Sequence, residues 1–382
     1  MLRTQLARFS ATRGVPVEIR PTPDSADQRH QLYVQWLNAR SAVPDVLQLD
    51  VVWTPEFAAA GWLSPLDPFA VETTAFFPAT IEANRWQGRL FGLPWFVDVG
   101  MLYWRTDIFD RPPRSYAELT TALQRGLRER GLRYGIVWQG ARYEGLITVF
   151  LEHLGGFGGR ILDDDGAVVV DSEQAVRALT WMRDAIHTSG ISPAAVLTWH
   201  EEETRFAFQN GAAGAMRNWP YAHALLRGSE SRVADRFAVA PMPAADGGRA
   251  TAALGGSQLA INARSRRPAD AWALIEFLTA PEQMLERARV VGQFPSRPAL
   301  FAAGTGLREA IGIDPATARA VIDAARPRPV TPVYTQLSEI LQIAVHRALT
   351  RQLEPRDALG GAAREMTGLL ERTGLTAARQ TP

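Results

Sequence analysis

The stretch from Pro44 to Asp67 constrains the fold more than any other part of the chain. Its apolar run Val46–Val52 predicts a buried strand, and a short helix and a turn follow at once. The strand carries one carboxylate, Asp50, and Trp53 follows three residues later. In open α/β sheets, ligands bind at the carboxyl ends of the strands. A carboxylate that accepts hydrogen bonds and an indole with a flat apolar face would suit a sugar there, because a sugar presents hydroxyls at its edge and C–H groups on its face.

The segments before this strand predict a β-α-β order. A helix that ends at Gly14 is followed by a short strand, Val15–Arg20, and by an amphipathic helix, Ser25–Asn38. A β-α-β order implies a parallel sheet. Strand and helix patterns alternate along all 382 residues, which is too long for one compact core, so we expect two α/β lobes.

The first predicted element is a helix, whereas a doubly wound lobe normally opens with a strand. One interpretation is a fold that starts with a helix. The other is a chain without its first strand, and without any signal peptide before that strand, through a late start codon or the choice of expressed fragment. We favour the second interpretation as an expectation.

Composition excludes several classes of function. The net charge of +1 gives no reason to expect a nucleic-acid partner. The chain has no cysteine, which excludes disulfides, thiol catalysis and thiolate metal sites. The six histidines are scattered without metal-ligand spacing, so we expect neither a metal nor a cofactor. No apolar run approaches the roughly 18 residues of a membrane span, and the first residues do not read as a signal peptide.

Enzyme motifs fail on inspection. His200–Thr204 lacks the second histidine of a zinc-protease helix, and Asp163–Gly166 lacks the EF-hand positions and reads as a hairpin turn. The glycines of Gly155–Gly159 follow a helix, not a strand, so they make a poor phosphate cradle. A pair of carboxylates such as Asp50 and Asp98 is compatible with glycoside cleavage, but it serves equally well to accept hydrogen bonds from hydroxyls.

A tryptophan on a stiff loop is a second candidate contact. Trp219 follows the predicted strand Ala212–Met216, and Pro220 disfavours helix at the residue before it. Such a loop presents the indole as a platform on which a ring can stack. The alternative is a buried tryptophan that anchors the loop.

Eight segments in order resemble the trehalose/maltose-binding proteins of ABC importers, within the periplasmic carbohydrate-binding proteins. The similarity covers nearly the whole chain, and the succession of segments carries it more than any one of them. The segments are Asp45–Trp53, Ala60–Asp67, Leu93–Gly100, Trp138–Gly145, Arg217–Tyr221, Val239–Pro243, Leu254–Gly256 and Arg326–Pro332.

The resemblance implies a set of sugar-binding residues. Polar and charged contacts would come from arginines and aspartates, aromatic contacts from rings near the motifs, and backbone contacts from the Gly-Gly turn. Charge-assisted hydrogen bonds of this kind contribute roughly 1.5–3 kcal/mol each. The implied residues are Arg29, Asp50, Trp53, Phe96, Asp98, Trp219, Gly255, Gly256 and Arg328.

The sequence departs from the family at three places. Phe96 stands where a tyrosine is frequent, which removes a hydroxyl contact, and Ser257 replaces an aromatic residue after the Gly-Gly turn. The acidic ligand that follows the family's first strand has no counterpart here. If that strand is missing, Asp50 faces an incomplete site.

The resemblance also implies an architecture and a biological role. We expect a two-lobe periplasmic-binding-protein fold of type II, with residues 1–103 and 257–302 in one lobe and residues 104–256 and 303–382 in the other. Hinge segments would lie near 100–105, 254–258 and about 300. A monomer outside the cytoplasm would capture trehalose or maltose in the cleft, close, and deliver the sugar to an ABC permease without catalysis. Two alternatives stay open: a secreted glycoside hydrolase that uses Asp50 and Asp98, and a sensor-domain binding protein that signals instead of importing.

Overall fold

The computed structural model describes residues 1–23 and 26–375, and its described residues form two compact units. Unit 1 consists of Met1–Asp98, Leu254–Pro315 and Val330–Tyr334, and unit 2 of the remaining segments from Val99 onward. The chain therefore changes unit after residues 98, 253 and 315, and again after residues 329 and 334. The sequence-based boundaries are 103, 256 and 302. Within the described residues, no helix is long and apolar enough to cross a membrane.

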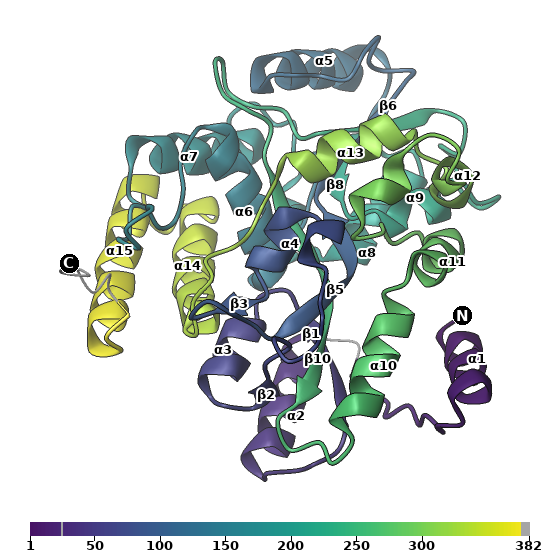
Figure 1. Cartoon of the computed structure of the whole chain (residues 1–382). Helices are drawn as coiled ribbons and strands as arrows, with labels where there is room; N and C mark the ends of the chain where they lie inside the picture. Colours follow the sequence, from purple (N-terminus) through teal and green to yellow (C-terminus); the bar gives the residue numbers. More distant parts are fainter. Residues whose placement is uncertain (24–25, 376–382) are drawn as a thin grey trace. The chain divides into compact units, whose positions relative to one another are not determined.

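Unit 1 is built from strands and from helices of two separate parts of the sequence, residues 2–82 and residues 268–311 (Figure 1). The helix predicted from residue 25 begins at Ala26 among the described residues, and the predicted strand ends at Asp50, two residues early. The elements are α1 Leu2–Arg13, α2 Ala26–Asn38, β1 Val46–Asp50, α3 Thr54–Ala59, β2 Leu63–Ser64, α4 Pro78–Glu82, β3 Arg85–Trp86, β4 Arg89–Leu90, β5 Gly92–Val99, the greater part of β10 Ala252–Asn262, α10 Pro268–Leu278, α11 Pro281–Val291 and α12 Leu307–Ile311.

Strand β10 organises the sheet of unit 1. It pairs antiparallel with β1, where Val46 lies opposite Ile261 and Asp50 opposite Ser257, and it also pairs with β2 and β5. The prediction of a parallel sheet from the β-α-β order is therefore wrong for β1, because β1 pairs antiparallel with β10. The prediction of a strand at Val15–Arg20 is also wrong, because this extended segment has no ladder partner among the described residues. The alternation of residue types in this segment indicates an extended backbone with one half-buried face. It does not indicate that a neighbouring strand is present.

The sheet of unit 1 separates two hydrophobic cores. On one face, Leu6 and Phe9 of α1 and Ile275 of α10 pack with Leu259 and Ile261 of β10. On the other face, Tyr33 and Leu37 of α2 pack with Leu47 and Leu49 of β1 and Ala260 of β10. Successive strand residues point to opposite faces, which assigns α1 and α10 to one layer and α2 and α3 to the other.

Unit 2 contains a second sheet with strand order β7-β8-β6-β9. The pairs of β6 with β8 and with β9 are antiparallel, and β7 runs parallel to β8. Two long helices, α14 and α15, follow in the last part of the described chain, and α15 packs beside α7 (Figure 1). The elements are β6 Met101–Arg105, α5 Tyr116–Glu129, β7 Tyr134–Val137, α6 Glu144–Gly156, α7 Glu173–His187, α8 Glu201–Gln209, β8 Ala213–Asn218, α9 Tyr221–Leu226, β9 Phe237–Ala240, α13 Pro315–Asp323, β11 Ala325–Arg326, α14 Tyr334–Leu349 and α15 Pro355–Arg372.

Candidate functional site

Asp50 is the last residue of β1, at the carboxyl end of the strand as predicted. Its Oδ1 accepts a hydrogen bond of 3.2 Å from the backbone N–H of Val52, which shapes the turn that follows. Across the ladder it faces Ser257, directly after Gly255 and Gly256, which lie inside strand β10 and not in the turn that the sequence analysis expected. The register of β10 therefore brings Asp50 and the two glycines to the same end of the unit 1 sheet.

Gly256 lies against the backbone of β5. Its φ of +107° is a conformation that residues with a side chain rarely adopt. A Cβ at this position would lie 3.0 Å from the backbone nitrogen of Asp98 and closer still to the carbonyl oxygen of Phe96. The glycine thus allows the two strands to approach, and it places Asp98 at the same end of the sheet as Asp50. Gly255, one residue earlier, is buried in β10.

A buried arginine stands beside Asp98. The guanidinium of Arg287, on α11, lies 3.6 Å from the ring centroid of Trp95, and Phe96 packs against that same indole. Burial lowers the pKa of Arg287 to about 9, and the negative charge of Asp98 opposes this shift. Phe96 itself is 7% exposed and belongs to the core around Trp95, so little of its ring is open to a ligand.

Trp53 is packed in a cluster of rings. It is 5% exposed, it stacks on Phe57 at a centroid distance of 6.2 Å, and the edge of Tyr33 meets it. The guanidinium carbon of Arg29 lies 5.4 Å from the centroid of the Trp53 ring, and Arg29 also donates to the carbonyl of Pro23. The structure therefore brings Arg29 and Trp53 together, with most of the indole used in packing.

Trp219 follows β8 and is held from three sides. Its Nε1 donates to Glu201 over 3.3 Å, and its carbonyl oxygen accepts a hydrogen bond of 2.7 Å from the hydroxyl of Tyr103. The guanidinium carbon of Arg217 lies 3.9 Å from the centroid of its ring. The indole is partly exposed, so it combines a fixed orientation with accessible surface.

The arginine under this indole belongs to a fully buried ion pair. The Nε of Arg217 donates to Oε2 of Glu152 over 2.8 Å, and both side chains have no exposed surface. Gln139 accepts from the same guanidinium, and the backbone N–H of Ala253 donates to Glu152. Gly100 leaves the space for this pair, because a Cβ there would collide with the Glu152 carboxylate.

Arg328 is bound to a carboxylate that the sequence analysis did not single out. Its Nη1 donates to Oε1 of Glu144 over 2.6 Å, and the hydroxyl of Ser338 donates to the other oxygen of Glu144. Glu144 is the first residue of α6, and its side chain is 25% exposed. Tyr143, directly before it, has its pKa raised first by burial and then by the nearby charge of Glu201.

Reasoning from sequence therefore missed Tyr143, Glu144 and Glu201. The segment Trp138–Gly145 was among the family-like motifs, so its Tyr-Glu pair at the start of a helix was an available signal. Glu201 stood in a run of three glutamates that reads as the first turn of a surface helix. Among the described residues, no cluster of side chains could hold a metal ion.

Six of the nine predicted residues thus form two sets, one in each unit, and Arg29, Trp53 and Phe96 belong to neither set. Asp50, Asp98, Gly255 and Gly256 meet at one end of the unit 1 sheet, whereas Trp219 and Arg328 belong to the network of unit 2 around Tyr143, Glu144 and Glu201. Both sets combine carboxylates with arginines or fixed indoles. Such groups accept hydrogen bonds from hydroxyls, donate hydrogen bonds to them and cover C–H faces.

Comparison with known proteins assigns the family. The model of the bacterial extracellular solute-binding proteins matches residues 5–285. The chain belongs to this family. It is also 37% identical over 358 residues to a Deinococcus radiodurans protein named "Probable ABC transporter-binding protein", an alignment that covers 91% of this chain and 84% of the relative.

Solved structures confirm the fold expected from the sequence. The structure titled "Maltose bound T. maritima MalE3" is 42% identical, covers 97% of this chain and 96% of its own, and superposes with a TM-score of 0.89. A Mycobacterium tuberculosis protein, UgpB in complex with glycerophosphocholine, is 22% identical with a TM-score of 0.83 over 97% and 95% of the two chains, which shows the fold alone. The chain therefore has the two-lobe, maltose-binding-protein-like fold.

This membership settles the coarse function. The chain is an extracytoplasmic solute-binding protein of the ABC sugar-importer type. No relative named above is a glycoside hydrolase, and the described geometry offers no observation that favours this alternative. The identity of the sugar and the role of each predicted residue stay predictions.

Proposed function

We propose that this protein captures an α-linked disaccharide, trehalose or maltose, and delivers it to an ABC permease without changing it chemically. The protein would act as a monomer in the periplasm or at the cell exterior. The observation that most strongly supports this proposal is the 42% identity, over nearly the full length, to a structure that contains maltose.

The side chains of unit 2 support a ring-shaped, hydroxylated ligand. Trp219 offers a partly exposed indole whose position is fixed by Glu201 and Arg217. Glu144 is held by Arg328 and Ser338 and keeps a quarter of its side-chain surface exposed. A carboxylate already oriented by an arginine can accept sugar hydroxyls without a large loss of side-chain entropy.

The residues of unit 1 would supply further hydroxyl acceptors. Asp98 stands beside the buried positive charge of Arg287, and Asp50 closes the end of β1. We propose that both sets take part in sugar binding and that binding is accompanied by hinge closure. The sequence-based boundaries of the lobes and hinges remain part of this proposal.

The experiment is an incubation of the purified protein with trehalose and with maltose, followed by two readouts. Binding without turnover predicts a rise in melting temperature and no release of glucose, because a ligand that binds the folded state stabilises it. Release of glucose at a rate that scales with protein concentration would refute the proposal in favour of a hydrolase. Absence of a thermal shift with either sugar at millimolar concentration would refute the choice of disaccharide.

A further inference from the structure

Unit 1 carries a hollow at the end of its sheet that lies away from Asp50. Asp50 closes the carboxyl end of β1, whereas Asp45 precedes the other end and accepts a hydrogen bond from the backbone N–H of Asn262, the last residue of β10. The five residues of β1, at about 3.3 Å each, separate the two ends by roughly 15 Å. The loops around Asn262 are therefore distinct from the residues of unit 1 that are proposed to contact a sugar.

Three arginines line the hollow, whose volume is about 470 Å³. Small-molecule sites in proteins occupy roughly 300–1,000 Å³, so the hollow has room for a small ligand. None of the lining residues is acidic, and the other three are alanine or glycine, whose small size leaves the space to the guanidinium groups. We call it the arginine hollow and define it by its lining residues, which are Arg40, Ala42, Gly61, Ala263, Arg264 and Arg266.

The positive charge of the arginine hollow is not balanced by ion pairs. In the part of the chain that the structure describes, no carboxylate oxygen lies within 4.0 Å of a guanidinium nitrogen of Arg40, Arg264 or Arg266. All three residues are exposed, so a ligand can reach them from solvent. Because a guanidinium group stays charged at neutral pH, the hollow gathers three like charges.

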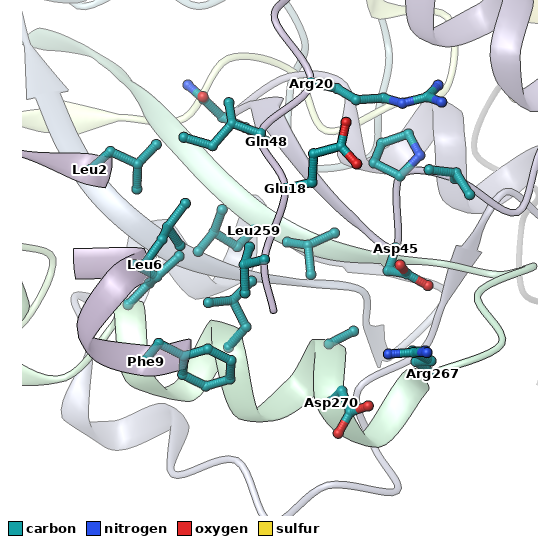
Figure 2. Close-up of a pocket in the computed structure, with 18 of the residues that line it drawn as sticks. Leu2, Leu6, Phe9, Glu18, Arg20, Asp45, Gln48, Leu259, Arg267 and Asp270 are labelled. Carbon is teal, nitrogen blue, oxygen red and sulfur yellow. The ribbon is translucent and has the colours of Figure 1, made fainter. Parts of the chain in front are cut away.

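The next arginine along the chain has a different environment. Arg267 lines a separate groove of unit 1 together with Asp45 and Asp270 (Figure 2). The Oδ1 of Asp45 also accepts a hydrogen bond from the hydroxyl of Ser265. These two carboxylates therefore belong to the neighbouring groove, and neither of them lines the arginine hollow.

A buried side chain holds the loops that carry the three arginines. Asn262 is 1% exposed, its Nδ2 donates to the carbonyl of Pro44 over 3.0 Å, and its Oδ1 accepts a hydrogen bond of 2.9 Å from the backbone N–H of Arg264. The backbone N–H of Ala263 donates to the carbonyl of Trp62 over 2.9 Å, which ties in the third segment of the lining. The backbone of the hollow is thus fixed in advance, and a ligand does not have to order it.

Three guanidinium groups in one hollow suit a multiply charged anion. Like charges repel one another, and an anion that contacts several of them replaces this repulsion by attraction. Guanidinium groups match the oxygens of phosphate and carboxylate groups, and they bind them through paired hydrogen bonds. A terminal phosphoryl group offers three oxygens and up to two negative charges, whereas a carboxylate offers two oxygens and one charge. The number of arginines therefore favours the phosphoryl group.

We propose that the arginine hollow binds a terminal phosphoryl group, as found in pyrophosphate, in phosphate monoesters and in the headgroup of phosphatidic acid. The site lies at the opposite end of the sheet from Asp50, so it acts separately from sugar binding. The inference goes beyond the proposed transport function and does not depend on which sugar the protein binds.

The first test is calorimetric titration with inorganic phosphate and with pyrophosphate at constant ionic strength, on the wild type and on the triple variant Arg40→Gln, Arg264→Gln and Arg266→Gln. We expect saturable binding to the wild type and at least tenfold weaker binding to this hollow variant. The melting temperature of the wild type should rise with either probe, because a ligand of the folded state stabilises it. Acetate at the same ionic strength should not raise the melting temperature.

A second triple variant separates the site from the net charge. Arg3→Gln, Arg289→Gln and Arg308→Gln remove the same charge from exposed arginines of unit 1 that do not line the hollow. This matched variant should bind both probes with the affinity of the wild type. Equal weakening in the two triple variants would refute the site, since it would indicate attraction by the net charge alone.

Vesicles distinguish the two sources of the phosphoryl group. Co-sedimentation is measured with vesicles of phosphatidylcholine and phosphatidic acid in a ratio of about four to one, and with vesicles of phosphatidylcholine alone. Sedimentation with the mixed vesicles that is lost in the hollow variant and kept in the matched variant supports a lipid headgroup as the ligand. Saturable binding of pyrophosphate without such sedimentation supports a free phosphate compound.

Three further results would overturn the proposal. The first is that the wild type binds neither phosphate, pyrophosphate nor the mixed vesicles, and the second is that acetate raises the melting temperature as much as phosphate does. The third is that a sugar which stabilises the wild type no longer stabilises the hollow variant, because the site would then not be separate from sugar binding. A wild type that binds pyrophosphate but no disaccharide would contradict only the proposed sugar.

Discussion

Two arginine–carboxylate pairs in unit 2 show how single residues prepare this protein for a polar ligand. Arg217 and Glu152 are fully buried, and they fix the position of Trp219 through its ring. Arg328 and Glu144 are arranged in the same way, but Glu144 remains partly exposed. The first pair is therefore structural, and we propose that the second contacts the ligand through the exposed part of Glu144.

The close packing around the buried pair makes Gly100 a sensitive position. In Gly100→Ala, the new methyl group would meet the Glu152 carboxylate and the Arg217 guanidinium, so we expect a loss of about 1–3 kcal/mol in the free energy of unfolding. Urea denaturation measures this loss. The matched control is Gly361→Ala in α15, where nothing lies near the added Cβ and helix propensity predicts a gain of roughly 0.5–1 kcal/mol. Equal stability of the two variants would contradict the packing described here.

His153 predicts how stability depends on pH. Burial, assisted by the positive charge of Arg217, lowers the pKa of His153 to about 3 from the ordinary value of 6.5. Below pH 6.5 the unfolded chain binds a proton at this histidine and the folded protein does not. The stabilisation is therefore complete above pH 6.5 and is lost progressively as the pH falls toward 3, with about 2–3 kcal/mol lost by pH 4.5.

Urea denaturation of the wild type and of His153→Gln at pH 7 and pH 4.5 checks this dependence. Glutamine stays neutral at both pH values and can still bond the hydroxyl of Tyr116, which lies 3.0 Å from Nδ1 of the histidine. The variant should lose less stability between the two pH values than the wild type. His200→Gln, at a half-exposed histidine, should behave as the wild type does. A loss of the same size in His153→Gln would refute the assignment.

At the scale of elements, helix boundaries follow from local chemistry. Ser172 caps α7, since its hydroxyl oxygen accepts from the backbone N–H of Ala175. Ser172→Ala should lower the free energy of unfolding by about 1 kcal/mol, because an N–H at the helix start loses its partner. The measurement is urea denaturation beside Ser189→Ala, a serine in the turn after the same helix. A larger loss in the Ser189 variant than in the Ser172 variant would contradict the capping role.

Strand pairing was harder to predict than the elements themselves. The patterns located β1 and α2 to within two residues, because hydrophobic period and turn residues are local properties. The antiparallel partner of β1 comes from β10, about 200 residues later, and no local pattern names such a partner. The same dependence on a distant partner explains the error at Val15–Arg20. The extended conformation was predicted correctly, but the described structure contains no strand that pairs with this segment.

The residues of the candidate site also differ in how far the sequence could predict them. The position of Asp50 at the end of a strand could be predicted from its local pattern, whereas Asp98, Gly255 and Gly256 were implied as ligand contacts by the resemblance to the family. The partners of Trp219 and Arg328 could not be predicted, since Glu201 and Glu144 reach them through tertiary contacts. Trp53 and Phe96 also show that ring type alone does not separate a stacking platform from a core ring, as both are largely buried.

At the scale of the whole molecule, the family and the fold of this protein are shown, whereas its ligand is proposed. Membership among the extracellular solute-binding proteins and the two-lobe fold rest on full-length similarity. The disaccharide, the permease and the contribution of each residue rest on the proposal. Substitutions at the two sets of residues therefore test the proposed ligand and the proposed contacts, which similarity of fold does not test.

The most direct measurement is isothermal titration calorimetry with trehalose and maltose on the wild type, Asp98→Ala and Trp219→Ala. We expect the wild type to bind one of the two sugars. We further expect that each variant, while still folded, binds that sugar at least tenfold more weakly, on the order of 1.4 kcal/mol. Half-buried Trp199, a tryptophan of unit 2 outside both sets, gives the matched control Trp199→Ala, which should keep the wild-type affinity. Unchanged affinity in both Asp98→Ala and Trp219→Ala, or no binding of either sugar by the wild type, would contradict the account.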